Sequence, residues 1–189
     1  YGLDAQEKEI QAHIAPAIEK TAAEDIQLVA DGMWTVPPTG ETATEYLTDA
    51  IEQDGGRTAT NMSDAVRNHT MANSEYPSGC RLNAPHVSLE SETVMPESLI
   101  TSIQPHYQVP HAPDIAEYFN YALRVAAPLL AVGVNSPFFP PDLYDDAPDA
   151  EIVSDAHMEK RVHVFEPVLN PPSEAEEPPT VGYPPALAS

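Results

Sequence analysis

The chain has 189 residues, with 8 Lys and Arg against 30 Asp and Glu, and its formal net charge is -22. A charge of this sign excludes the basic footprint of a nucleic-acid binder, and it repels an anionic membrane surface for the same reason. The longest nearly apolar run, from Val125 to Val134, contains a proline and is too short to cross a bilayer. The 42% hydrophobic content suits one core of ordinary size, so we expect a single domain.

The negative charge is spread along the whole chain and is not gathered in an acidic tail. Such a chain repels itself in dilute buffer, and the repulsion is relieved when the screening length falls to about 3 Å near 1 M salt. We therefore predict a cytoplasmic protein of a halophile, with an acidic but ordinary or partly disordered protein as the alternative. The single cysteine, Cys80, allows no intrachain disulfide, which fits a reducing compartment.

The first expected elements are helical. Isoleucines at helical spacing predict a helix from Asp4 to Ala23, which Pro16 should kink or split. Alternating residues predict a strand over Ile26 to Val36. A short helix is expected from Thr42 to Gln53, stopped by the turn at Asp54-Gly55-Gly56.

The middle of the chain contains the clearest strand pattern, from Leu82 to Glu90. Within it His86, Ser88 and Glu90 fall on one face and apolar side chains fall on the other, as in a half-buried strand. The polar row offers metal-binding or hydrogen-bonding groups, and a solvated strand face is the alternative. A helix is expected next, from Ser91 to Ser102.

The strongest helix pattern begins at Asp114, with an apolar stripe that predicts a core position and a kink at Pro128. The proline-rich, acidic segment from Asn135 to Pro148 predicts a long ordered loop or a lid. Met158 to Phe165 alternates again and predicts a second strand with a polar face. On that face Arg161 offers a cation that could clamp a carboxylate or phosphate, unless it forms an ordinary structural salt bridge.

Two segments in the second half of the chain resemble a known family. The run APLLAVGVNSPFF, from Ala127 to Phe139, is similar to the leucine- and alanine-rich helix and N-S-P-F-W turn of the glutamate-cysteine ligase and carboxylate-amine ligase family, with Phe139 in place of Trp. Lys160-Arg161 resembles the family's S-S-R segment, although the serines are replaced. The same segment continues to Pro171-Pro172, which resembles the family's terminal G-P-P.

Two further segments resemble the same family upstream. Asn83 to Leu89 is similar to its H-V-H-V-G strand, with His86 on the second histidine and Ala84 on the first. Asp31 to Trp34 resembles the strand around G-T-H-P, without its histidine. All four segments follow the family's order and together cover most of Ala30 to Pro172.

The resemblance implies an α+β fold that is glutamine-synthetase-like, with an antiparallel sheet flanked by helices. It places residues 1–172 in part of a single ligase-like domain and leaves 173–189 as a proline-rich acidic tail or wrapping segment. The family's acidic E-x-E strand is not found ahead of Tyr1. We therefore expect an internal fragment of a longer, haloarchaeal-type family member.

The resemblance further implies an enzyme that uses ATP and Mg²⁺ (or Mn²⁺) to phosphorylate a carboxylate, usually the glutamate side chain, which an amine such as cysteine then attacks. The expected partners are these small molecules, and a homo-oligomer is possible. The site residues assigned on this basis are Arg161 and Glu90 for catalysis, Asn135, Ser136 and Arg81 for the nucleotide, and His86 and Ser88 for the metal.

Two alternatives to the ligase remain. One is a noncatalytic relative that keeps the fold for binding or assembly. The other is a metal-binding acidic protein that uses His86, Glu90, His157 and His163.

Overall fold

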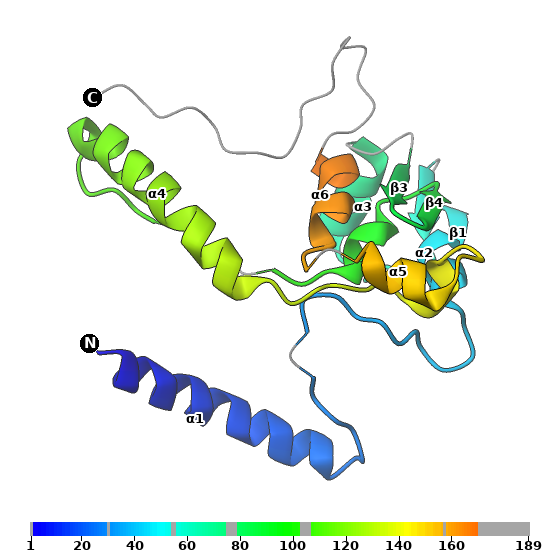
Figure 1. Cartoon of the computed structure of the whole chain (residues 1–189), viewed down its shortest axis with the longest axis horizontal. Coiled ribbons are helices and arrows are strands. Elements are labelled where there is room, and N and C mark those ends of the chain that lie inside the picture. Colours follow the sequence, from blue (N-terminus) through cyan, green and yellow to red (C-terminus); the bar gives the residue numbers. More distant parts are fainter. Residues whose placement is uncertain are drawn as a thin grey trace. The chain divides into compact units, whose positions relative to one another are not determined.

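The computed structural model describes residues 2–29, 31–53, 56–74, 79–102, 107–156 and 158–169 (Figure 1). The chain divides into two compact units, Tyr1–Asp31 and Gly32–Ser189. Within the described residues, none of the helices combines the length and the apolar character that a membrane span requires. The predicted single domain over 1–172 stays a prediction, and the tail at 173–189 lies outside the described residues.

The first unit consists mainly of helix α1, Leu3–Ala22, which confirms the predicted helix. The helix continues through Pro16, so the prediction that the proline splits it is wrong. None of its residues is buried, and the apolar stripe that defined it, which includes Ile14, is about half exposed. The predicted strand over Ile26 to Val36 is also wrong, because the described part of this segment forms only an isolated bridge between Met33 and Ile100.

The second unit begins with helix α2, Ala43–Thr48, which Thr42 starts through a capping box with Glu45. The helix is shorter than predicted, because the chain becomes extended after Thr48 and forms strand β1, Ala50–Gln53. This strand pairs antiparallel with β2, Gly56–Ala59. Of the predicted turn, Gly56 is the first residue of β2, and residues 54–55 lie outside the described part of the chain.

The predicted strand from Leu82 to Glu90 is a hairpin instead. Strands β3, Cys80–Ala84, and β4, Val87–Ser91, pair antiparallel, and the chain reverses between them at residues 85–86. His86 therefore sits in a turn, with a φ of 64°, and not on a strand face. The predicted alternation holds on β4 itself, where Val87 and Leu89 are buried and Ser88 and Glu90 are exposed.

Helix α3, Val66–Ser74, precedes the hairpin, and a 3₁₀ helix, η1, Met95–Leu99, follows it. The helix predicted from Ser91 to Ser102 is wrong outside this short turn. Ser91 ends β4, and its buried hydroxyl donates to the carbonyl oxygen of Leu47 at 2.9 Å and accepts from the backbone N–H of Thr93. These hydrogen bonds of the Ser91 side chain disfavour the start of a helix at this residue.

Helix α4, Ile115–Gly133, confirms the strongest helix prediction and contains Pro128. It follows a short 3₁₀ turn, η2, Ala112–Asp114. The expected core position is wrong, because none of its residues is buried and Val132 is 84% exposed. The segment from Asn135 to Pro148 is irregular, as predicted, apart from a 3₁₀ turn, η3, Pro141–Leu143.

The predicted strand from Met158 to Phe165 is wrong, because helix α6, Arg161–Leu169, occupies most of it. A run this short satisfies both the strand and the helix period, and packing decides between them. In the helix Val164 is completely buried, and α6 packs against β3 and η1. A short helix, α5, Asp149–Ser154, precedes it.

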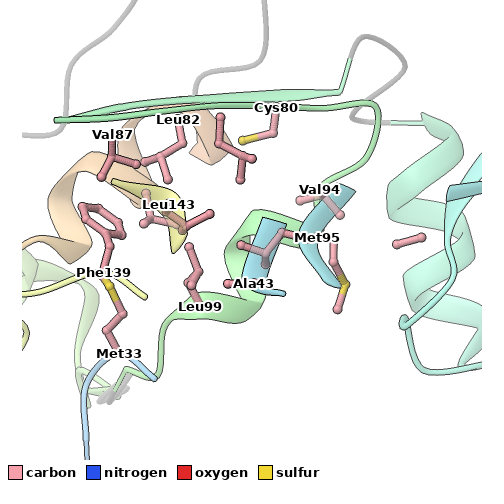
Figure 2. Close-up of a cluster of buried hydrophobic side chains, with 14 residues drawn as sticks. Met33, Ala43, Cys80, Leu82, Val87, Val94, Met95, Leu99, Phe139 and Leu143 are labelled. Carbon is pink, nitrogen blue, oxygen red and sulfur yellow. The ribbon is translucent and has the colours of Figure 1, made fainter. Parts of the chain in front are cut away.

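The core lies under the β3–β4 hairpin, where buried side chains from distant segments meet (Figure 2). Leu82 and Val87 come from the hairpin, Leu99 comes from η1, and Met33 and Phe139 come from irregular segments. Met33 and Phe139 are each 1% exposed and belong to two of the family-like segments. The part of the chain that the structure describes contains two small antiparallel sheets together with helices, so the α+β class is confirmed.

Candidate functional site

Three family-like segments meet at Ser136, and we call this place the Ser136 junction. The backbone N–H of Ser136 donates to the carbonyl oxygen of Met158 at 3.1 Å, and the N–H of Lys160 donates to the carbonyl oxygen of Ser136 at 2.8 Å. Together these bonds form a parallel bridge between Ser136 and Glu159. Ser136 is 1% exposed, so the junction is internal.

Gly32 brings the third segment to the Ser136 junction. A Cβ atom at this position would lie 2.3 Å from both Asn135 Oδ1 and Ser136 Oγ, so only glycine fits there without rearrangement. On its other side the carbonyl oxygen of Gly32 accepts a hydrogen bond from the backbone N–H of Thr101 at 3.0 Å. The Oγ of Ser136 donates to Asn135 Oδ1 at 3.2 Å. Both predicted nucleotide-binding residues of this turn are thus packed against Gly32.

Arg161 lies beside the Ser136 junction, and its guanidinium group is hydrogen-bonded to other groups of the protein. Its Nε and Nη2 donate to the two carboxylate oxygens of Glu159 at 2.7 and 2.5 Å. Its Nη1 donates to the carbonyl oxygen of Thr101 at 2.9 Å, and Nη2 also donates to the carbonyl oxygen of Gly133 at 3.4 Å. The Arg161 and Glu159 side chains are only 17% and 12% exposed. Arg161 therefore ties three segments together, and its catalytic role stays a prediction.

Arg81 and Glu90, predicted for the nucleotide and for catalysis, lie opposite each other on β3 and β4. Their side chains form an ion pair at 2.6 Å and are 67% and 70% exposed. Ser88 is on the same outward face, where its Oγ donates to Asn83 Oδ1 at 3.4 Å. In this structure the three predicted residues form a polar surface of the hairpin, and their functional roles stay predictions.

His86 lies between two aspartates at the hairpin turn. Its Nε2 is 3.1 Å from Asp155 Oδ2 and its Nδ1 is 3.4 Å from Asp145 Oδ1, while its side chain is 15% exposed. The hydrogen bond with Asp155 raises the pKa of His86, against the opposing effect of burial. Ligand atoms of His86, Glu151 and Asp155 lie within 4.8 Å of one another, so this group could hold a metal ion.

Ser88, the second predicted metal residue, is not part of that three-residue group. It shares with His86 only the lining of a hollow of about 450 Å³, which Tyr144 and Asp145 also line. Sequence reasoning missed Glu151 and Asp155. Their spacing of four residues was a usable signal, because it places both on one side of a helical turn.

Lys160 connects the Ser136 junction to the His86 turn. The residue is 1% exposed, and its Nζ donates to the carbonyl oxygen of Asp155 at 3.3 Å. Burial lowers the pKa of Lys160. Asp155 therefore contacts His86 through its carboxylate and Lys160 through its backbone. The sequence pattern showed Lys160 only as a replacement for a family serine.

The family-like segments of this acidic α+β protein thus gather beside Arg161 and Lys160. The chain matches the family model described as Glutamate-cysteine ligase family 2 (GCS2) over residues 1–186, and it belongs to this family. Membership points to a ligase-type enzyme. No curated protein and no solved structure matches the chain.

Proposed function

We propose that the protein is an ATP-dependent ligase that forms an amide between a carboxylate and an amine through an acyl phosphate. The glutamate side chain is the proposed carboxylate, and cysteine is one candidate for the amine. A glutamine-synthetase-like fold is part of the proposal. The observation that carries it is the meeting of three family-like segments at the Ser136 junction in a chain that belongs to the GCS2 family.

Phosphoryl transfer depends mainly on positioning and on neutralising negative charge, so its protein parts are cations and polar groups held in place. Arg161 meets that requirement, because Glu159 and two backbone carbonyls orient its guanidinium. Asn135 and Ser136 are the proposed nucleotide contacts of the neighbouring turn. Arg81 and Glu90 are proposed as a second, more exposed pair that approaches the substrates.

The family generally uses ATP and Mg²⁺. Bound ATP would supply the phosphoryl group, and a divalent cation would neutralise its charge. Of the predicted metal residues, His86 belongs to a group with a suitable donor set, because Glu151 and Asp155 add two carboxylates to its imidazole. Two oxygen ligands suit Mg²⁺ or Mn²⁺, whereas the nitrogen ligand favours Mn²⁺.

The proposed setting is the cytoplasm of a salt-adapted cell, with small molecules as partners and self-association possible. The support is the net charge of -22, spread over the whole chain. Circular dichroism in rising KCl tests this setting. Full structure in dilute buffer would remove the salt-adaptation part of the proposal and leave the ligase part intact.

A noncatalytic relative that keeps the fold for binding is the second candidate. The observation that favours it is that both predicted substrate-binding arginines already have carboxylate partners. Arg161 pairs with Glu159, and Arg81 pairs with Glu90. A substrate carboxylate or phosphate would have to displace or join these partners.

The test is ADP formation by the protein in molar KCl with ATP, Mg²⁺ or Mn²⁺, glutamate and a panel of amines that includes cysteine. Turnover that needs both glutamate and one amine, and that falls in Arg161→Ala but not in the exposed control Arg67→Ala, supports the ligase. A folded protein that binds ATP without turnover points to a different carboxylate. A folded protein that binds no ATP favours the noncatalytic relative.

A further inference from the structure

A hollow of about 400 Å³ is lined by residues of α2, of the segment that follows β2, of α3 and of the region around η1. Its lining includes Tyr46 from α2 and Asn68 from α3. A volume of this size is in the range of small-molecule sites. The described lining contains none of the residues assigned to the Ser136 junction, the nucleotide or the metal. A ligand in this hollow would therefore be additional to the proposed ligase sites.

Glu97 carries the one charge in the described lining of the hollow. The residue is partly buried, and within the described chain its carboxylate forms no hydrogen bond or ion pair with another residue. Arg161 and His86, which are also largely shielded from solvent, both have carboxylate partners. Burial raises the pKa of Glu97, because its charged form has lost hydration without gaining a partner. A cation bound beside Glu97 would supply that partner.

The two amide side chains of the lining offer acceptors to the same ligand. The Nδ2 of Asn61 donates to Glu41 Oε2 at 3.3 Å and to the carbonyl oxygen of Tyr46 at 3.4 Å. The Nδ2 of Asn68 donates to the carbonyl oxygen of Ser63 at 3.1 Å. These partners only accept hydrogen bonds, so they fix which amide atom is the nitrogen. Each Oδ1 accepts no hydrogen bond from the described residues and is left as an acceptor.

The rest of the lining is largely apolar and is held in place by the core. Val94 and Met95 are 8% and 7% exposed and belong to the core cluster. The ring of Tyr46 packs edge to face against Trp34, with the centroids 5.6 Å apart. The Nε1 of Trp34 donates to the carbonyl oxygen of Ser98 at 2.7 Å, which ties the ring pair to another lining residue. The apolar surface is therefore formed before a ligand arrives.

We propose that this hollow binds a primary ammonium ion with a short apolar body, with Glu97 as its charge partner. An ammonium group donates three hydrogen bonds and accepts none, which complements one carboxylate and two amide oxygens. The ring of Tyr46 adds a surface that attracts cations, and Met95 and Val94 contact the apolar body. The site is independent of the ligase proposal, because it needs neither ATP nor turnover.

Titration of the full chain with benzylamine, which is protonated at neutral pH, tests the site. The measurement is made by NMR in molar KCl, where screening suppresses loose attraction of cations to the acidic surface. We expect saturable shifts of the methyl signals of Met62 and Met95, which line the hollow. Benzyl alcohol has the same ring without the charge and should bind roughly tenfold more weakly or worse, as expected for hydrogen bonds to a charged group.

Glu97→Gln keeps the size of the side chain and removes its charge, so it should weaken benzylamine binding by roughly tenfold or more. The variant also loses a carboxylate that burial disfavours, so we expect it to fold. Glu52→Gln is the matched control, because it removes the same charge from an exposed position of β1 outside the hollow. It should leave the affinity unchanged.

Three results would overturn the proposal. Equal weakening in Glu97→Gln and Glu52→Gln would show diffuse attraction to the acidic chain. Equal affinity for benzylamine and benzyl alcohol would show that the hollow selects only the apolar ring. The third is the absence of saturable shifts at Met62 and Met95 in the folded protein.

Discussion

The backbone N–H of Lys160 donates to the carbonyl oxygen of Ser136 at 2.8 Å, and this bond joins segments that are more than 20 residues apart in the chain. The side chain of Lys160 then reaches Asp155, which contacts His86. One buried lysine therefore lies between the junction proposed for catalysis and the group proposed for metal binding.

Gly32→Ala should destabilise the protein by about 1–3 kcal/mol, which is the usual cost of overpacking. The reason is that the new Cβ would lie 2.3 Å from Asn135 Oδ1 and Ser136 Oγ. Gly133→Ala is the matched control, because its Cβ meets nothing within 4 Å and the residue ends a helix. Urea unfolding of both variants measures the difference. Equal stability of the two variants would show that the Ser136 junction is loosely packed.

Arg161→Ala should cost about 3 kcal/mol, because it leaves the largely buried carboxylate of Glu159 without its partner. Arg81→Ala removes a mostly exposed ion pair and should cost less than about 1 kcal/mol. The double variant Arg161→Met, Glu159→Gln should recover part of the loss, since no unpaired charge remains. Chemical denaturation of Arg161→Ala, Arg81→Ala and the double variant measures these changes in the free energy of unfolding. An Arg161→Ala chain as stable as the Arg81→Ala chain would contradict the structural role.

Glu97→Gln should stabilise the protein near neutral pH. Burial raises the pKa of Glu97 above its ordinary value of 4.5, so the folded state binds the proton more tightly than the unfolded state. The favourable contribution of protonated Glu97 is fully present below pH 4.5 and is lost as the pH rises through the folded-state pKa.

The gain from Glu97→Gln should therefore be largest above the folded-state pKa and should vanish in acid. Thermal melts of both proteins from pH 4 to 8, in steps of roughly half a unit, measure this gain in stability across the ordinary carboxyl range. Glu19→Gln, on the exposed face of α1, is the control and should show no such trend. A gain of the same size at every pH would point to packing instead of charge.

Cys80 should be nearly inert in the folded protein. The residue is 6% exposed, and burial raises the pKa of its thiol to about 11. At pH 8 the thiolate fraction, and with it the rate of labelling by a thiol reagent, should fall by roughly two orders of magnitude relative to the unfolded chain. Because this is the single cysteine of the chain, labelling reports on one site. Rapid labelling of the folded protein would show that β3 opens easily.

The long elements were predictable because their periodicity extends over several turns. Helices α1 and α4 appeared where apolar residues recur at helical spacing, and β4 buries the residues that alternation assigned to the core. Short segments were not predictable in this way. The run from Met158 to Phe165 fits both periods, and its part from Arg161 onward is helical, with Val164 buried and the helix packed against β3.

In the candidate site, too, some features follow from the sequence and others depend on the tertiary structure. The sequence by itself determined the acidic character, the two long helices, and the family through segments such as Ala127 to Phe139, because these are properties of composition and local order. Only the tertiary structure decided that the chain reverses at His86, that Arg161 reaches the carbonyl oxygen of Thr101, and that Asp155 meets His86. Each of these depends on contacts between segments or on a turn that returns the chain, and local periodicity carries no record of which distant groups will pack together.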